Sequence, residues 1–500
     1  MSPEESTFKP ALKLMGGRMA AFMITFLTPV LLVRQFSQAD FGTYKQFLLI
    51  ASTPYLIGCA FSECLFYFLP KDPARSGRYV MNAMLMLFAS GLLCFGVMMY
   101  YASGIAGLMS NTALESFVPL MSLYLLFMLM GTVLEISMIS HKRYTLAAGT
   151  YVISDVLRAA FLVIPALITH SLAWALMGSV VFFAIRVVAA FAYLRWDFGN
   201  DVRFDRQLLK EQWAYAMPYS LAGIVFVIQQ NYHQYAVAFF FDQVTFAIYA
   251  VGCLQIPLVD FLVTPTSNVM MVRMSEQLRD GKAESLVPIW HDTTRKLALL
   301  FFPFVGLLVV NAYSLITLLF TTAYAASVPI FMVWCLSILL AIFQTDGVLR
   351  VFAQIRYLFV TNVARMILLL LFMGWFLTTF HLMGAVMITL AGMVMAKVMA
   401  LLRVRKVLAT SYAGLLPWKS LGGTTVAAMV AAIPGIILNA KLAVPTIVLL
   451  PISGMAYMAT YAAVALALGL LTKNEIRAIK QILFIWNRKG VAARQAAASQ

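Results

Sequence analysis

The sequence predicts an all-α polytopic membrane protein, and three observations carry this prediction. Of the 500 residues, 62% are hydrophobic and 11% are charged, whereas soluble domains are about half apolar and about a quarter charged. Apolar runs of about 20 residues, long enough to cross the roughly 30 Å hydrocarbon layer as helices, recur along the whole chain. Because weakly alternating segments of about ten residues are absent, spanning helices are expected rather than a barrel.

About fourteen transmembrane helices are expected from these runs. They are placed at 14–34, 43–69, 79–101, 116–138, 146–167, 173–195, 214–240, 246–272, 297–319, 328–349, 359–379, 383–402, 421–438 and 444–471. The first run follows basic residues but lacks a small-residue cleavage site, so it is expected to remain as an uncleaved helix. The five cysteines fall inside apolar runs without metal-ligand spacing, which favours free, structural thiols.

Lys and Arg are distributed unevenly over the loops. With the first loop taken as external, the odd-numbered loops hold roughly two of them, and the even-numbered loops with both tails hold roughly twenty-nine. This bias predicts a multi-pass protein of the inner (cytoplasmic) membrane with both termini in the cytoplasm. The net charge of +16 is therefore assigned to topology and to contacts with membrane lipids, and nucleic acid is not an expected partner.

Matched stretches about 205 residues apart indicate an internal repeat. The aligned pairs are "SQADFGTYKQFLLIASTP" (37–54) with "DQVTFAIYAVGCLQIP" (242–257), "SDVLRAAFLVI" (154–164) with "TNVARMILLLL" (361–371), and Leu-Met-Gly at 176–178 and 382–384. Chance similarity of apolar helices is the alternative, but the matches include polar residues and turn positions. Two units of about six spans each enter the membrane in the same direction, so they are parallel repeats.

The repeat predicts the organisation of the chain. Two pseudo-symmetric six-helix bundles, an N-terminal lobe (1–200) and a C-terminal lobe (201–410), are expected. Two appended transmembrane helices (411–472) and a basic cytoplasmic tail (473–500) follow them.

Ionisable residues inside the expected spans are functional candidates, because each costs from about 2.5 kcal/mol upward at bilayer depth. They are Arg34, Lys45, Glu63, Asp155, Arg158, Arg186, Asp260, Asp346, Arg365 and Lys397. The last two, with Asp346, lie nearer the cytoplasmic ends of their spans. For Arg34 and Lys397, simple snorkelling to the interface is the alternative.

Arg158 and Arg365 are the leading candidates for binding substrate, because the repeat places them at equivalent positions. Two facing half-bundles would direct both into one central cavity, and guanidinium groups suit phosphate oxygens. Arg34, Lys45 and Arg186 are further candidates for the same cavity. Local neutralisation of Arg158 by Asp155, three residues earlier, is the alternative, although Asn362 cannot neutralise Arg365 in the second copy.

The stretch "QQNYHQY" (229–235) places Gln230, His233 and Gln234 on one helical face. The two amides could bind sugar hydroxyls, and His233 could carry a proton. Hydrogen bonding between helices is the alternative for this face. Elsewhere, no glycine-rich phosphate loop with Lys-Ser/Thr, no HExxH motif and no arguable Ser/His/Asp grouping occurs. The chain is therefore not expected to be an enzyme, and no cofactor or metal is expected.

Several stretches resemble the polysaccharide-transporter branch of the multidrug/oligosaccharidyl-lipid/polysaccharide (MATE-like) exporter superfamily, which includes O-antigen-type oligosaccharide flippases. They are "QADFGTYKQFLLI" (38–50), "FSECLFYFLPK" (61–71), "IYAVGCLQIPLVDF" (248–261), "VMMVRMSEQLRDGKAESL" (269–286) and "LLFTTAYAASVPIF" (318–331). The resemblance covers roughly residues 10–405. It implies two six-helix lobes around a cavity that opens alternately to either side of the membrane. Arg158 and Arg365 rest on the repeat and not on a shared motif.

The resemblance also implies a cargo, a polyprenyl-diphosphate-linked oligosaccharide used as a precursor of a surface polysaccharide such as the O-antigen of lipopolysaccharide. Glycosyltransferases and a polysaccharide polymerase are candidate partners. Because no nucleotide site is found, a proton or sodium gradient is the expected energy source, with Asp155, Glu63, Asp260 and His233 as candidate coupling residues. Two rival functions remain at this stage: a multidrug (organic-cation) antiporter of the same superfamily and a flippase for the peptidoglycan lipid precursor.

Overall fold

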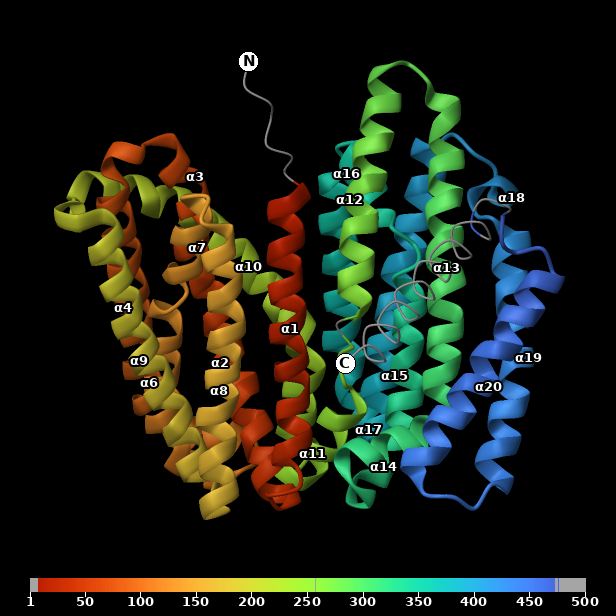
Figure 1. The fold of residues 1–500 in the computed structure, drawn as a ribbon, viewed down its shortest axis with the longest axis horizontal. Coiled ribbons are helices and arrows are strands. Elements are labelled where there is room, and N and C mark those ends of the chain that lie inside the picture. The colour runs from red at the N-terminus through yellow and green to blue at the C-terminus, as the bar shows by residue number, and fades with distance from the viewer. Residues whose placement is uncertain (1–7, 257, 473–474, 476–500) are drawn as a thin grey trace, which may run out of the picture. The chain divides into compact units, whose positions relative to one another are not determined.

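The computed structural model describes residues 8–256, 258–472 and 475, and all its regular elements within them are helices (Figure 1). Ten of these helices are long and apolar enough to cross a membrane. The predicted all-α polytopic class is therefore confirmed, while the number of fourteen spans stays a prediction. The basic tail expected at 473–500 lies outside the described residues, apart from Glu475.

The α-helices follow one another along the chain with short connections, and five 3₁₀ segments lie between them. The α-helices are α1 (Phe8–Leu32), α2 (Gln38–Glu63), α3 (Leu65–Lys71), α4 (Ser76–Tyr100), α5 (Ala102–Leu108), α6 (Val118–Met130), α7 (Val133–Ser140), α8 (Tyr144–Thr169), α9 (Leu172–Phe198), α10 (Arg206–Phe240), α11 (Gln243–Gly252), α12 (Leu258–Arg279), α13 (Leu286–Val310), α14 (Ala312–Phe320), α15 (Val328–Leu340), α16 (Thr345–Val351), α17 (Ile355–Val407), α18 (Tyr412–Leu415), α19 (Trp418–Lys441) and α20 (Thr446–Ala467). The 3₁₀ segments are η1 (Pro73–Arg75), η2 (Thr112–Phe117), η3 (Gly199–Asp201), η4 (Ala283–Ser285) and η5 (Thr322–Ser327).

The chain divides into two compact units, which we describe separately. Unit 1 contains Met1–Leu254, Leu319–Ile330 and Leu369–Thr389, and unit 2 contains Gln255–Leu318, Phe331–Leu368 and Leu390–Gln500. The lobe boundaries expected at residues 200 and 410 stay predictions.

Unit 1 is a bundle in which α1 packs on α8, α8 on α9, α4 on α6, and α2 on both α10 and α11. Serine and aspartate residues cap its helices: Ser37 accepts a hydrogen bond at the start of α2, and Asp242 accepts one at the start of α11. Such side chains satisfy backbone N–H groups that have no partner within the helix. The α1 helix runs from the top of Figure 1 to the bottom, so the turn before α2 lies at the lower end.

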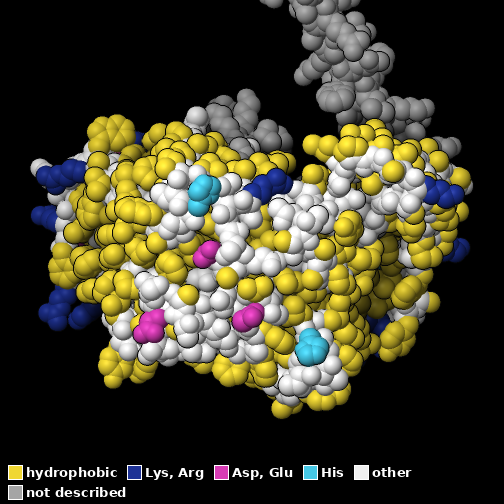
Figure 2. All heavy atoms as spheres, turned by 90° about the horizontal axis from the view of Figure 1, so that it is seen from below, with side chains coloured by type: hydrophobic (Ala, Val, Ile, Leu, Met, Phe, Trp, Pro, Cys, Tyr) yellow, Lys and Arg dark blue, Asp and Glu magenta, His cyan; other side chains and the backbone are white. Residues whose placement is uncertain are grey.

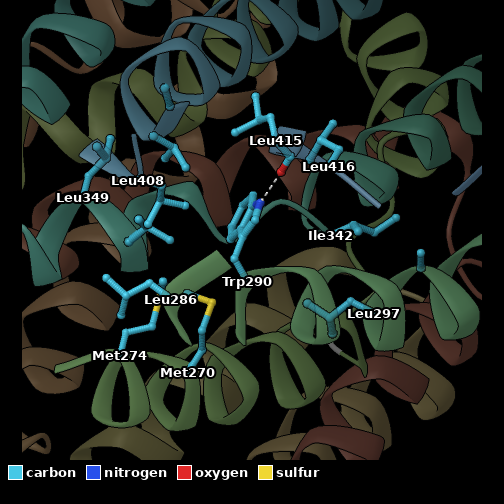
Figure 3. Close-up of a cluster of buried hydrophobic side chains, with 14 of the residues drawn as sticks. Met270, Met274, Leu286, Trp290, Leu297, Ile342, Leu349, Leu408, Leu415 and Leu416 are labelled. Atoms are coloured by element: carbon cyan, nitrogen blue, oxygen red, sulfur yellow. Dashed lines mark hydrogen bonds between the residues drawn. The ribbon is translucent and has the colours of Figure 1, made fainter. Parts of the chain in front are cut away.

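Unit 2 has its main core around Trp290 of α13, shown in Figure 3. Its buried members are Met270, Met274, Leu286, Trp290, Leu297, Ala298, Phe301, Ile342, Val348, Leu349, Ala400, Val404, Leu408, Leu415, Leu416 and Leu421. The indole N–H of Trp290 donates a 2.8 Å hydrogen bond to the carbonyl of Leu415. A buried tryptophan needs such a partner, so this bond fixes the α18 segment against α13.

The repeat predicted from the sequence is visible in how the helices begin. Gln38 and Gln243 each open a helix, α2 and α11, immediately after its cap. Phe41 and Phe246, three residues further on, are both fully buried. These two helices also pack on each other, and a Cβ at Gly42 would lie 1.9 Å from the carbonyl oxygen of Gln243. Only glycine allows this approach without a backbone shift.

The two Leu-Met-Gly copies provide close contacts between helices. A Cβ on Gly178 would lie 1.9 Å from the carbonyl oxygen of Phe161, and one on Gly384 would lie 2.0 Å from that of Phe376. Glycine is common where membrane helices approach this closely. The repeated tripeptide therefore lies where two helices of a hairpin meet. These are α8 and α9 in the first copy, and the parts of α17 before and after His381 in the second.

Two further features of the repeat were not predicted. The α17 helix is broken at His381, which has a φ of 52°, and α8 ends at His170, which has a φ of 49°. These two residues are 211 positions apart in the sequence. Likewise η2 with the start of α6, "TALESFVP" (112–119), corresponds to η5 with the start of α15, "TAYAASVP" (322–329).

The connection between α9 and α10 is held on α4. Arg78 forms ion pairs with Asp201 at 3.0 Å and with Asp205 at 3.3 Å, and the Asn82 amide donates to the carbonyl of Asp205. The backbone N–H groups of Leu208 and Gln207 and the Arg78 guanidinium together hold the pKa of Asp205 below its usual value. The segment that leads into the second repeat is therefore fixed rather than a loose linker.

Figure 2 shows the end of the helices that lies at the bottom of Figure 1, and most of its surface is hydrophobic or uncharged. A scarcity of Lys and Arg is typical of the external side of a membrane protein. Because Lys and Arg side chains are also visible in this view, the predicted orientation stays a prediction.

Candidate functional site

A charged cavity lies inside unit 1. Its volume is about 370 Å³, and α2, α6, α7, α8 and α9 line it with the break between α6 and α7. Its ionisable lining consists of Glu63, Glu135, Asp155, Arg158 and Arg186. Three carboxylates and two guanidiniums give this first cavity a formal charge of −1. Because charges within membrane-spanning segments are costly, this group of residues is the candidate functional site.

Two of the three carboxylates are paired with arginine. Asp155 lies 2.6 Å from Arg158 on the same helix, and Glu135 of α7 lies 2.6 Å from Arg186 of α9. Glu63, the last residue of α2, is exposed on the cavity lining, and no hydrogen bond or ion pair is found for it within the described chain. Pairing lowers the cost of these charges, which would be large for an isolated buried ion.

The Glu135–Arg186 pair lies at an interrupted helix. The guanidinium of Arg186 also donates a long hydrogen bond, 3.4 Å, to the carbonyl of Gly131, where α6 ends. A Cβ at Gly131 would lie 3.1 Å from Nε of Arg186, so glycine makes room for the guanidinium. Glu135 is 3% exposed, and its Oε1 has no hydrogen-bond partner among the described residues.

A second, smaller cavity of about 220 Å³ adjoins this region between α1, α2 and α8. Lys45 and Arg158 are its charged lining residues, and no carboxylate is part of its lining. Hydroxyl groups surround the two cations, from Thr25, Thr28, Tyr44, Tyr124 and Ser179. With a formal charge of +2, this second cavity is suited to an anion with several oxygen acceptors.

Arg158 lines both cavities and is therefore the boundary between them. Besides Asp155, its guanidinium donates a 2.6 Å hydrogen bond to the Thr25 hydroxyl of α1. The local pairing considered as an alternative from the sequence is thus present. A guanidinium with five donors can keep this pair and still bind another acceptor.

The other candidates in unit 1 lie outside both linings. Arg34 is exposed in the turn between α1 and α2. His233 is buried, and its Nδ1 lies 2.7 Å from the Tyr249 hydroxyl, a hydrogen bond between α10 and α11. Gln230 is exposed and Gln234 half-buried. The contact of His233 with Tyr249 agrees with the alternative of hydrogen bonding between helices at that residue.

In unit 2, the guanidinium of Arg365 is half-buried, and its Nε has no hydrogen-bond partner within the described residues. Arg365 lies sixteen positions before the break at His381, whereas Arg158 lies twelve positions before His170. The two arginines therefore differ by four residues, or about one helical turn, and occupy the same face of equivalent helices. Because they belong to different units, a shared chamber stays a prediction.

Lys397 and Asp346 lie together in unit 2, with 3.7 Å between Nζ and the carboxylate. The ammonium of Lys397 also donates to the carbonyl of Phe343 and to the Thr345 hydroxyl, both at 3.1 Å. The side chain of Asp260, a predicted coupling residue, lies outside the described part of the structure, although its backbone belongs to α12.

Sequence reasoning missed Glu135, which the structure places at the centre of the first cavity's charges. The signal was available, because this acid lies inside the expected span 116–138. Among the described residues, no group of three His, Cys, Asp or Glu side chains could hold a metal ion. The two cavities offer guanidinium, ammonium and hydroxyl groups that can bind an anion.

The fold is that of a polytopic membrane protein, and charged cavities lie within its unit 1. A family model described as "Polysaccharide biosynthesis protein" matches residues 31–329, so the chain belongs to this family of polysaccharide biosynthesis proteins. A search of curated proteins found no match.

Solved transporter structures share the fold. The lipid II flippase MurJ, in an inward closed conformation, aligns with a TM-score of 0.67 and 11% identity over 89% of this chain and 98% of MurJ. An inward-facing multidrug resistance MATE transporter of the MOP superfamily aligns with a TM-score of 0.59 and 12% identity over 78% of this chain and 94% of that one. A MOP-superfamily transporter from Pyrococcus furiosus Vc1, described by the reverse polarity of its binding pocket, aligns with a TM-score of 0.52 and 12% identity. This alignment covers 80% of the present chain and 94% of the Pyrococcus chain. These similarities confirm the superfamily fold that the sequence resembles.

Proposed function

We propose that this protein is a flippase that moves a polyprenyl-diphosphate-linked oligosaccharide, a precursor of surface polysaccharide, across the cytoplasmic membrane. Membership in a family of polysaccharide biosynthesis proteins and a transporter fold support the proposal. The observation that carries it is the second cavity, where Lys45 and Arg158 stand among hydroxyl groups without a carboxylate in the lining. This lining matches a diphosphate, which has several anionic oxygens and needs donors.

The physical problem in such transport is the headgroup. The lipid tail can remain in the bilayer, while the sugar and the diphosphate require a wet route with cations along it. Lys45, Arg158 and Arg186 supply cations in unit 1, and Arg365 supplies one in unit 2. Arg34, Gln230 and Gln234 are further proposed contacts for the sugar and phosphate groups. The two lobes would then alternate access to the site from each side.

Ion coupling is part of the proposal. Asp155 and Glu63 line the first cavity and are the proposed coupling carboxylates there. His233 and Asp260 remain candidates of the same kind. A transporter in which ion and substrate bind to neighbouring groups can couple them through their mutual electrostatics.

We place the protein in the inner membrane with both termini in the cytoplasm, next to the glycosyltransferases that build the lipid-linked precursor and the polymerase that uses it. Reporter fusions at loops before and after α2 test the orientation. A fusion to the turn at Arg34 is expected outside, and one near Arg75 inside. The opposite result would reverse the assignment of both termini.

The decisive experiment is a deletion strain complemented with variants. We expect the deletion to lose surface polysaccharide and to accumulate lipid-linked oligosaccharide on the cytoplasmic side. Arg158→Ala is expected to leave most of this defect, although the protein still inserts. Arg279→Ala is the matched control, because Arg279 is an exposed arginine at the end of α12. Normal surface polysaccharide in the deletion strain would refute the proposed function.

A flippase for the peptidoglycan lipid precursor is the second candidate. The alignment with the lipid II flippase MurJ covers 89% of this chain, whereas those with two MATE transporters cover 78% and 80%. Identifying the lipid that accumulates after depletion separates the two: a repeating-unit glycan supports our proposal, and the peptidoglycan precursor supports the alternative. A multidrug antiporter is less well supported, because two of the three carboxylates of the first cavity are neutralised by arginine.

A further inference from the structure

The same three-part arrangement occurs twice in the chain, at a spacing of 211 residues. Each copy consists of an interrupted helix, an acid just after the interruption and a base on the second arm of the following hairpin. We call each copy a clasp. The first clasp is Gly131, Glu135 and Arg186, and the second clasp is Phe343, Asp346 and Lys397. Glu135 and Asp346 are 211 positions apart, as are Arg186 and Lys397.

In each clasp the base donates a hydrogen bond to a carbonyl at the interruption and forms an ion pair with the acid. Arg186 reaches the Gly131 carbonyl at 3.4 Å and Glu135 at 2.6 Å. Lys397 reaches the Phe343 carbonyl at 3.1 Å and Asp346 at 3.7 Å. Free carbonyls at an interruption have lost their helical donors, so a cation there stabilises the broken conformation.

The two clasps differ in burial. The side chain of Glu135 is 4% exposed, whereas that of Asp346 is 64% exposed. Asp346 is therefore open to its surroundings. Glu135 is enclosed, its Oε1 has no described partner, and the ion pair with Arg186 is its main stabilising contact. A buried carboxylate satisfied on one oxygen only is costly to keep charged.

We propose that Glu135 is a proton-binding site, and that its protonation opens the first clasp and releases Arg186 into the first cavity. A proton from water bonds to Oε1, the carboxylate becomes a neutral acid, and the guanidinium keeps its charge. The formal charge of the cavity then changes from −1 to 0. This inference names the coupling group of the proposed transporter and rests on that function only for the link to transport.

A proton fits this site better than a metal cation does. A metal cation needs several oxygen ligands, and here the guanidinium of Arg186 already occupies one side of the carboxylate. A proton needs a single oxygen, and Oε1 is available. The charged and titratable groups around Glu135 are Arg186 of α9, Asp155, Arg158 and Tyr151 of α8, and Tyr55, Cys59 and Glu63 of α2. Asp155 raises the cost of a charged Glu135, and Arg186 lowers it.

Release of Arg186 has a consequence for anion binding. A charged Glu135 competes with an anionic ligand for the guanidinium, so proton binding and anion binding favour each other. The break between α6 and α7 also loses its cation, so its backbone opens more readily. Opening of this backbone can be measured without any cargo.

The test is amide hydrogen exchange of purified protein in detergent, followed for peptides that cover the two interruptions. We expect the exchange rate at 128–135, corrected for the intrinsic effect of pH, to rise about tenfold per unit fall in pH over the range in which one proton binds. In Glu135→Gln we expect this rate to be raised at every pH. Asp346→Asn is the matched control and should leave the pH dependence at 128–135 unchanged.

A corrected rate that is independent of pH in the wild type overturns the proposal, as does a pH dependence that persists in Glu135→Gln. If Glu135→Gln does not fold, infrared spectra of protein labelled with ¹³C-glutamate decide the question. We expect a protonated carboxyl band that shifts with the label in the wild type and is missing from the labelled set in Glu135→Asp. Retention of that labelled band in Glu135→Asp refutes the site. Neither result depends on the cargo, so glycan export can fail or persist independently.

Discussion

Arg158 and Arg365 lie on the same face of equivalent helices, but their surroundings differ. Arg158 is bound to Asp155 and Thr25, whereas the Nε of Arg365 is buried without a partner among the described residues. The two halves of this protein therefore share backbone geometry and charge and differ in how the charge is neutralised. A cation without a fixed partner is more available to a ligand. A cation that is already paired, such as Arg158 with Asp155, can bind the ligand fully only when the ligand replaces the carboxylate.

The largest expected effect concerns export. We expect Arg365→Ala to reduce glycan export more than Arg158→Ala does, because Arg365 has no described counter-ion to compete with the cargo. The double variant should abolish export. Surface polysaccharide per cell, normalised to membrane-inserted protein, measures this. Normal export in the double variant would remove both arginines from the site.

A second effect concerns the close contacts that both halves share. We expect Gly178→Ala and Gly384→Ala each to destabilise the protein by about 1–3 kcal/mol, the usual cost of overpacking, because each Cβ would meet a carbonyl oxygen. Thermal unfolding in detergent measures the loss. Gly96→Ala is the control, since no atom lies within 4 Å of its Cβ position. If only one of the two variants lost stability, the two hairpins would not share the same close packing.

A third prediction concerns stability, for which we expect Arg158 to matter more than Arg365, the opposite of the order expected for export. Arg158→Ala should lower stability by about 1–3 kcal/mol, because Asp155 is left charged without its partner. Arg365→Leu should leave stability unchanged or raise it, because a buried Nε without a partner is removed. Arg158→Ala combined with Asp155→Ala should recover part of the loss. Equal losses for both arginines would indicate a partner for Arg365 in the folded protein.

The hairpin tips give a smaller effect. In the first half, the Asn111 amide donates to Thr43 at 2.9 Å and to Gln46 at 2.7 Å, and all three are buried. In the second half, the Ser327 hydroxyl donates to the carbonyl of Ile248 at 2.7 Å. We expect Asn111→Ala to cost more than Ser327→Ala, about 1–3 against about 1 kcal/mol. Equal unfolding temperatures for the two variants would contradict this comparison.

The smallest effect is a pH dependence at the connection between the halves. The pKa of Asp205 is lowered in the folded protein, so its contribution is present above the ordinary aspartate value and is lost as the pH falls through the lowered one. We expect Asp205→Asn to reduce the fall in stability on acidification. Unfolding measured at several pH values compares the variant with the wild type. An unchanged acid dependence would exclude Asp205 as a source of it.

The sequence predicted the parts of this structure that depend on composition and local pattern. Runs of apolar residues predicted the helical membrane fold, and the repeat located Gln38 and Gln243 at equivalent helix starts. The interruption after Met130 could not be predicted, because Gly131 and Thr132 retain helical backbone angles. The pairing of Glu135 with Arg186 spans 51 residues, and no local periodicity encodes such a partner. The sequence alignment paired Arg158 directly with Arg365, whereas the breaks at His170 and His381 offset the two residues by four positions, because apolar helices align almost equally well after a shift of one turn.

The position of Arg158 between the two cavities gives unit 1 an electrical direction. One compartment, bordered by Lys45, has a formal charge of +2, and the next, bordered by Glu63 and Glu135, has a formal charge of −1. A small anion and a small cation entering from the same side would therefore meet opposite barriers at the same side chain. Fixed charges of opposite sign on the two sides of Arg158 would thus hinder either kind of ion in passing from one compartment into the other.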